Sequence, residues 1–143
     1  MAKNANGKFV LKALLLTENN GKILVQFVRR GKKGNLYRPL GGHVEFGERS
    51  ESTIKREIKE EVNSSIKGLE LLGVIENIYR SETRLHHEID FIYKGNLSNE
   101  NLFENEIFDR DEDGRKEKAY WIAKSMFKEE KIKIVPRGIL KYL

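Results

Sequence analysis

The chain has 143 residues, of which 38% are hydrophobic and 34% charged. This length suits one compact domain, 1–143, with a single core, and apolar runs such as residues 14–16 exclude a disordered chain. The absence of cysteine excludes disulfides, thiolate metal sites and cysteine nucleophiles. Any metal ion must therefore be held by oxygen atoms or by the three histidines.

Charge and hydropathy bear on partners and location. No stretch approaches the roughly 20 apolar residues of a membrane span, and residues 1–7 lack the apolar core of a signal peptide. We therefore expect a cytoplasmic protein without a membrane partner. The net charge of +5 attracts anions, from phosphates to RNA. Because the lysines are spread along the whole chain, a generally solvated surface explains this charge as well as a nucleic-acid face does.

The first third of the chain predicts three strands. Apolar, β-rich runs at 9–16 and 22–28 flank residues 19–21, whose Asn-Asn-Gly sequence permits the positive φ of a tight turn, so we expect a hairpin. Two glycines among basic residues predict an exposed loop at 29–35, before a short strand at 36–40.

A helix follows this strand, which Gly41 and Gly42 are expected to end. Ser50 is the expected N-cap, and residues 51–62 contain no helix breaker. This segment is predicted to be an amphipathic helix, because apolar residues recur every four positions at Ile54, Ile58 and Val62.

The second half predicts strands at 69–79, 88–93 and 120–122, and a closing helix at 136–143 that begins with proline. Residues 96–118 are acidic and basic throughout, so we expect a mobile loop there. Strands and helices in this order predict a mixed sheet with helices packed against it.

The helix at 51–62 carries an acidic face. At 100° per residue, Glu57, Glu60 and Glu61 fall within an arc of about 100°, away from the apolar face. Like charges at this spacing cost a few tenths of a kcal/mol per pair, which a bound divalent cation would reverse. An ordinary solvated helix with i,i+4 ion pairs at 51–55 and 56–60 is the alternative, and the helix alone leaves both open.

The residues before the helix favour the cation. The chain resembles the Nudix box, Gly-x5-Glu-x7-Arg-Glu-U-x-Glu-Glu-x-Gly-U with U aliphatic, at Gly42, Glu48, Arg56, Glu57, Ile58, Glu60 and Glu61. Six fixed residue types at roughly 7% each occur in register by chance with odds on the order of 10⁻⁵ in such a chain. The chain is therefore identified as similar to Nudix hydrolases.

The end of the box departs from the family pattern. Asn63 stands at the glycine and Ser64 at the aliphatic position. Asparagine reaches the left-handed conformation of a helix C-terminus better than other non-glycine residues. We therefore expect the turn to survive, with Ile66 supplying the apolar contact.

The resemblance implies an α/β/α sandwich with a mixed β-sheet and a loop-helix-loop catalytic motif. It implies metal-dependent hydrolysis of a pyrophosphate bond, in a nucleoside diphosphate linked to another group or in a nucleoside triphosphate. The implied cofactor is Mg²⁺ or Mn²⁺, which takes carboxylate and carbonyl oxygens. A homodimer is a further expectation at family level.

The same resemblance assigns roles within the box. Glu57, Glu61 and the carbonyl oxygen of Gly42 would hold the ion, with Glu60 a further ligand or the general base. Glu48 and Arg56 would form a supporting pair; the alternative is a plain surface ion pair worth under about 1 kcal/mol.

Other candidates lie outside the box. Families within this fold place the general base differently. Some place it in a downstream loop, where this chain offers Glu106, Asp111, Glu112 and Asp113, of which Glu106 and Glu112 are retained as candidates. Substrate phosphates could be held by Arg29, Arg30 and Arg38, although basic strand ends are common. Surface or core positions are expected instead for His43, His86, His87, Tyr79 and Trp121.

Two other functions stay open. A catalytically silent Nudix-fold nucleotide sensor would be expected to lose a box glutamate or the arginine, and all are present here. The net positive charge suggests an RNA 5′-end pyrophosphohydrolase, whose affinity for RNA would depend strongly on salt concentration. The box itself does not specify the group attached to the diphosphate.

Overall fold

The computed structural model describes residues 7–32 and 34–143. Residues 1–6, which belong to the segment inspected for a signal peptide, and residue 33 of the expected loop lie outside the described residues. The strands are β1 (Phe9–Leu16), β2 (Glu18–Asn19), β3 (Lys22–Arg29), β4 (Leu36–His43), β5 (Ile66–Arg80), β6 (Leu85–Leu97), β7 (Ile107–Glu112), β8 (Arg115–Ala123) and β9 (Lys133–Ile134). The helices are α1 (Ser50–Val62), α2 (Lys124–Lys128) and the 3₁₀ turns η1 (Glu100–Phe103) and η2 (Arg137–Tyr142).

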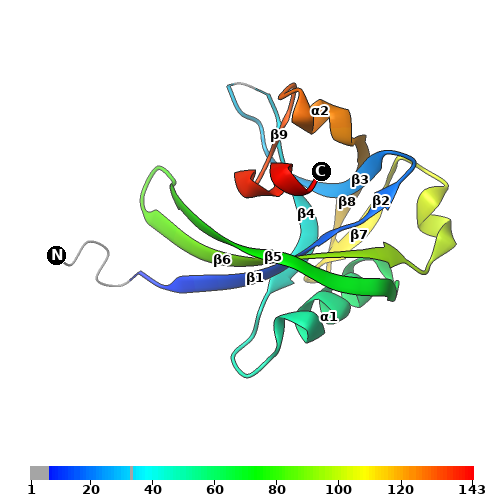
Figure 1. Cartoon of the computed structure of the whole chain (residues 1–143), viewed down its shortest axis with the longest axis horizontal. Coiled ribbons are helices and arrows are strands. Elements are labelled where there is room, and N and C mark those ends of the chain that lie inside the picture. Colours follow the sequence, from blue (N-terminus) through cyan, green and yellow to red (C-terminus); the bar gives the residue numbers. More distant parts are fainter. Residues whose placement is uncertain (1–6, 33) are drawn as a thin grey trace.

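The strands form one mixed sheet in the order β5-β6-β1-β4-β3-β8-β7. Strand β1 runs parallel to β6 and antiparallel to β4. In Figure 1, α1 covers one face of this sheet, whereas α2 and the C-terminal turn η2 lie on the other. This arrangement confirms the predicted α/β/α sandwich.

Two apolar cores fill the sandwich because side chains alternate between the two faces of each strand. Leu15 of β1 packs in the core under α1 with Ile54 and Ile58. Its neighbour Leu14 packs in the opposite core with Phe127 and Ile139. The apolar face of α1 is thus fixed against the sheet. As a result, Glu57 on the acidic face lies against Gly42, near the end of β4.

The predicted pairing of the first two long strands is wrong. Asn20 and Gly21 do have positive φ, 51° and 77°, but their turn joins β2 to β3. Strand β1 instead lies between β4 and β6. The physical reason is that residues 13–16 are buried on both faces, which suits a central strand with a parallel neighbour rather than one arm of a hairpin.

The predicted mobile loop at 96–118 is also wrong. It contains the end of β6, the turn η1, all of β7 and the first part of β8. Strands β7 and β8 pair through a turn at Asp113 and Gly114, with φ of 48° and 83°. The charged residues are cross-strand partners, as in the ion pairs of Lys118 with Asp109 and Lys116 with Asp111.

Smaller differences concern element ends. Strand β4 continues to His43, so Gly41 and Gly42 lie inside it. Arg49 is the N-cap of α1, and the hydroxyl of Ser50 instead shares a 2.6 Å hydrogen bond with that of Tyr93. The predicted closing helix is the 3₁₀ turn η2. Among the described residues, no helix has the length and apolar character needed to cross a membrane.

Asn63 ends α1 as predicted. It is left-handed, with φ 53° and ψ 50°, and its N–H donates to the carbonyl of Lys59 at 3.0 Å. Ile66 packs against the core under α1. The departures from the box therefore leave the end of the helix intact.

We predict that Asn63→Gly is neutral or mildly stabilising. Glycine reaches this conformation without strain, and the bond that Asn63 accepts, from the Asn99 side chain at 3.2 Å, goes to its backbone carbonyl. Urea unfolding should show a change of less than about 1 kcal/mol in the free energy of unfolding. A larger loss would mean that the Asn63 side chain itself makes stabilising bonds.

Candidate active site

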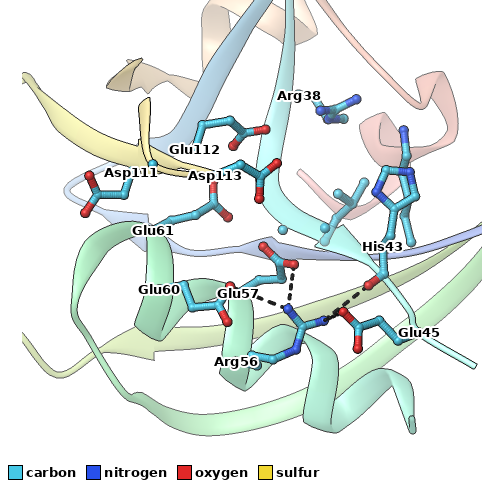
Figure 2. A pocket seen from close by; sticks show the side chains of 15 residues that line it. Arg38, His43, Glu45, Arg56, Glu57, Glu60, Glu61, Asp111, Glu112 and Asp113 are labelled. Atoms are coloured by element: carbon cyan, nitrogen blue, oxygen red, sulfur yellow. Dashed lines mark hydrogen bonds and ion pairs between the residues drawn. The ribbon is translucent and has the colours of Figure 1, made fainter. Parts of the chain in front are cut away.

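A cavity of about 750 Å³ opens between α1, the end of β4 and the turn between β7 and β8. Figure 2 shows carboxylates from α1 and from this turn pointing toward one another across it. Its acidic lining residues are Glu45, Glu57, Glu60, Glu61, Asp111, Glu112 and Asp113, and its basic ones are Lys12, Arg38 and Arg56. The cavity therefore joins the predicted acidic face to a second, basic group of side chains on β1 and β4.

Gly42 brings the backbone of β4 against the helix. A Cβ at this position would collide with the carboxylate of Glu57. Glycine therefore lets the carboxylate of Glu57 rest against the strand, and a side chain here would displace it. The end of β4 and the Glu57 side chain of α1 lie directly against each other.

Glu48 and Arg56 join the loop before α1 to the helix. The Nε and Nη2 groups of Arg56 donate to the two carboxylate oxygens of Glu48 at 2.9 and 3.0 Å. Thr53 donates to the same carboxylate at 2.6 Å. The hydrogen bonds from Arg56 and then Thr53 lower the pKa of Glu48 to about 2. Arg56 also donates to Glu57 and to the carbonyl of His43. A bidentate pair with these further bonds is more strongly held than a single surface ion pair.

The three box glutamates of α1 have different surroundings. The side chain of Glu61 is 3% exposed and accepts a 2.9 Å bond from Arg110 on Oε1, whereas its buried Oε2 has no partner. Burial, only partly offset by Arg110, raises the pKa of Glu61 to about 8. Burial also raises the pKa of Glu57, against the opposing effect of Arg56. Glu60 is exposed, and Arg56 contacts it at 3.5 Å.

These groups fit a divalent cation bound by few protein ligands. No group of three or more His, Asp or Glu side chains among residues 7–32 and 34–143 is arranged as a metal-binding cluster. However, the unpartnered Oε2 of Glu61 is a buried oxygen that lacks the hydrogen bond such atoms normally make. Carboxylate oxygens suit a hard ion that keeps several waters.

Arg110 lies behind the cavity lining and contacts Glu61 and Glu112, and Gln26 contacts Arg110; neither was predicted from the sequence. Arg110 donates to Glu61 and Glu112, and also to Gln26 Oε1 at 2.9 Å and the carbonyl of Lys118 at 3.1 Å. One signal could have found it. Side chains alternate between the two faces of a strand, so Arg110 lies on the same face of β7 as Phe108, which packs on the core.

Of the remaining candidates for the phosphate contact and for the general base, some line the cavity and others do not. Arg38 and Glu112 line the cavity. Arg29 and Arg30 are exposed and lie outside its lining. Glu106 forms an exposed ion pair with Lys22, also outside the lining.

Of the histidines and large aromatic residues considered, only His43 lines the cavity. It lies at the exposed end of β4, as expected, and in the cavity partial burial together with Lys12 and Arg38 lowers its pKa. His86 stacks on Tyr79 with ring centroids 4.6 Å apart, and His87 pairs with Glu76. Trp121 is buried in the core and donates to the carbonyl of Leu102.

A family model of the NUDIX domain matches residues 11–143 of the chain. The chain belongs to the Nudix family. It is therefore a hydrolase of phosphoric anhydride bonds, in a family that acts on small nucleotide-derived substrates and generally uses divalent metal ions.

Solved structures share the Nudix fold. A NUDIX hydrolase from Nitrosomonas europaea superposes with a TM-score of 0.65 at 20% identity, over 94% of this chain and 85% of that one. A MutT NUDIX hydrolase from Burkholderia pseudomallei gives 0.60 at 21% identity, over 82% and 85%. A MutT protein from Bacillus halodurans gives 0.60 at 19% identity, over 92% and 80%. At these identities the likeness shows the fold.

Proposed function

We propose that the chain is a Mg²⁺- or Mn²⁺-dependent pyrophosphohydrolase. Its substrate is a nucleoside diphosphate linked to another group, or a nucleoside triphosphate. The observation that carries this proposal is one cavity lined by Glu57, Glu61 and Gly42, in which the buried Oε2 of Glu61 has no hydrogen-bond partner. The family membership supplies the reaction class.

In this proposal Glu57, Glu61 and the Gly42 carbonyl hold the ion. A bound divalent ion neutralises charge on the phosphate oxygens and lowers the pKa of a bound water. Glu60 and Glu112 line the same cavity and are the carboxylates that could accept the proton of the attacking water. Glu48 acts through Arg56, which holds the loop and Glu57 in place.

The basic side of the cavity suits the phosphates. Arg38 lines it from β4 and has a buried Nε without a hydrogen-bond partner. Lys12 also lines it but is paired with Glu88 at 2.8 Å. We therefore assign the contact with substrate phosphate to Arg38.

A substrate screen tests the proposed function. Nucleoside triphosphates, nucleoside diphosphate sugars, dinucleoside polyphosphates and other diphosphate-linked compounds would be incubated with Mg²⁺, and phosphate release measured with and without a coupled phosphatase. We expect at least one compound to give two phosphorylated products. Binding of these compounds without any turnover, in Mg²⁺ or in Mn²⁺, would contradict catalysis and favour a nucleotide sensor.

The raised pKa of Glu61 gives metal binding a defined pH dependence. In the metal-free protein the carboxyl of Glu61 titrates at about 8, so a proton must leave when an ion binds near neutral pH. We predict that Mn²⁺ affinity, measured by calorimetry, rises from pH 6.5 to pH 8.5 with release of a proton. Glu61→Gln should remove most of this dependence. A wild-type affinity that stays constant over this range would contradict the assignment.

A further inference from the structure

Arg110 occupies an unusual position beside the proposed metal site. Its side chain is 5% exposed and lies on β7, outside the box. A buried cation next to a site for a divalent cation is electrostatically unfavourable unless it has another task. The arrangement of its donors indicates what that task is.

One nitrogen of Arg110 serves two carboxylates. The Nη1 group donates to Oε1 of Glu61 at 2.9 Å and to Oε2 of Glu112. Because its two N–H bonds point in fixed, divergent directions, they set how the two carboxylates face each other. A lysine ammonium on a flexible stem would supply the charge without this geometry.

The remaining donors of Arg110 fix the guanidinium itself. Nε donates to the carbonyl of Lys118 on β8 at 3.1 Å, and Nη2 to Oε1 of Gln26 on β3 at 2.9 Å. The amide of Gln26 is buried and donates in turn to the carbonyl of Pro39 on β4 at 3.3 Å. Hydrogen bonds therefore connect the strand that carries Gly42, through Gln26 and Arg110, to the glutamate on α1.

We propose that Arg110 is a positioning residue for metal binding: it holds Oε1 of Glu61, leaves Oε2 of that carboxylate available to the ion, and fixes Glu112 in the same cavity. This inference rests on the proposed function, since it assigns a task toward the ion that Glu61 would bind. The alternative is a buried ion pair that only stabilises the fold. Buried ion pairs in general add little net stability, because the cost of removing both charges from water offsets their attraction.

The test is calorimetric titration of Mn²⁺ alone into the metal-free protein, without substrate. We expect Arg110→Met to weaken the Mn²⁺ Kd by about tenfold or more, as loss of a residue that orients a metal ligand does. Arg110→Lys should weaken it in the same direction, because the charge remains but the fork is lost. The matched control is Arg137→Met, which removes an exposed arginine paired with Glu130 and should leave the Kd unchanged.

A double-mutant cycle separates positioning from general damage. If Arg110 acts by orienting Glu61, adding Arg110→Met to Glu61→Gln should change the Mn²⁺ Kd by no more than about twofold, the usual error of additivity. Equal effects of Arg110→Met in both backgrounds would overturn the inference. So would tighter Mn²⁺ binding by Arg110→Met, which is the result expected when a neighbouring cation is removed and nothing else changes.

The outcomes also separate this inference from the proposed function. Circular dichroism would check each variant, and if Arg110→Met does not fold, Arg110→Lys decides: a wild-type Kd in that variant overturns the inference. Absence of Mn²⁺ binding in the wild type, or a wild-type Kd in Glu61→Gln, would overturn the proposed function itself. Weak binding by Glu61→Gln with normal binding by both Arg110 variants would overturn only the positioning role.

Discussion

Glu57→Gln and Glu61→Gln should each lower kcat by about 100-fold or more, on the order of 3 kcal/mol of activation free energy. Each substitution keeps the size of the side chain but removes an anionic oxygen from the cavity that we assign to the ion. Steady-state kinetics at saturating Mg²⁺, with the substrate found by the screen, would measure the effect. The matched control is Glu51→Gln, an exposed carboxylate on the same helix that pairs with Lys55.

The stability of these variants without metal distinguishes a site from a structural acidic face. Burial raises the pKa of Glu61, so the metal-free fold disfavours its charged form, and the neutral amide of glutamine avoids that cost. Glu112 still pairs with Arg110 after Glu61→Gln. We therefore expect unchanged or raised melting temperatures. Retained activity with lower stability would contradict the site, as would equal behaviour of Glu51→Gln and Glu61→Gln.

Withdrawal of the metal should abolish turnover. We expect no product in excess chelator, full recovery on adding Mg²⁺ or Mn²⁺, and poor activity with Ca²⁺. The reason is that Ca²⁺ binds oxygens at about 2.3–2.6 Å in loose geometry, against about 2.0–2.1 Å in the octahedral geometry of Mg²⁺. With cysteine absent from the chain, the donors in this cavity are hard oxygens that suit these ions. Full turnover in chelator would contradict the metal assignment.

Local patterns in the sequence predicted the parts of the site that depend on one segment. The helical period placed Ile54 and Ile58 in the core, and residue chemistry predicted the left-handed end at Asn63. The resemblance to the Nudix box implied that Glu48 and Arg56 pair, which the structure shows. Each of these features is decided by residues a few positions apart, so no knowledge of the tertiary fold was needed.

Features that depend on distant pairing were missed. Strand β1 pairs with β6, in which each partner residue lies 78 positions later in the chain. The turn signal at Asn20 and Gly21 does not show which strands pair across the sheet. In β7 and β8 the high charge suggested a loop, although Asp113 and Gly114 carry a recognisable hairpin signal. Alternating acids and bases on facing strands stabilise a sheet through cross-strand pairs.

Missing this hairpin also meant missing Arg110. Its role depends on contacts with Gln26 and Glu61, which are 84 and 49 positions away. A charged residue within a polar segment gives no sign by itself that it is buried. Only the placement of β7 against α1 shows that a cation lies among the box carboxylates.

The most direct test of the account is the position of a bound ion. Crystals of the protein soaked in Mn²⁺ would be measured for anomalous scattering at the manganese edge. The account predicts a peak within coordination distance of Glu57, of Oε2 of Glu61 and of the Gly42 carbonyl, in the cavity beside β4. A peak elsewhere, with this cavity empty at saturating Mn²⁺, would contradict it.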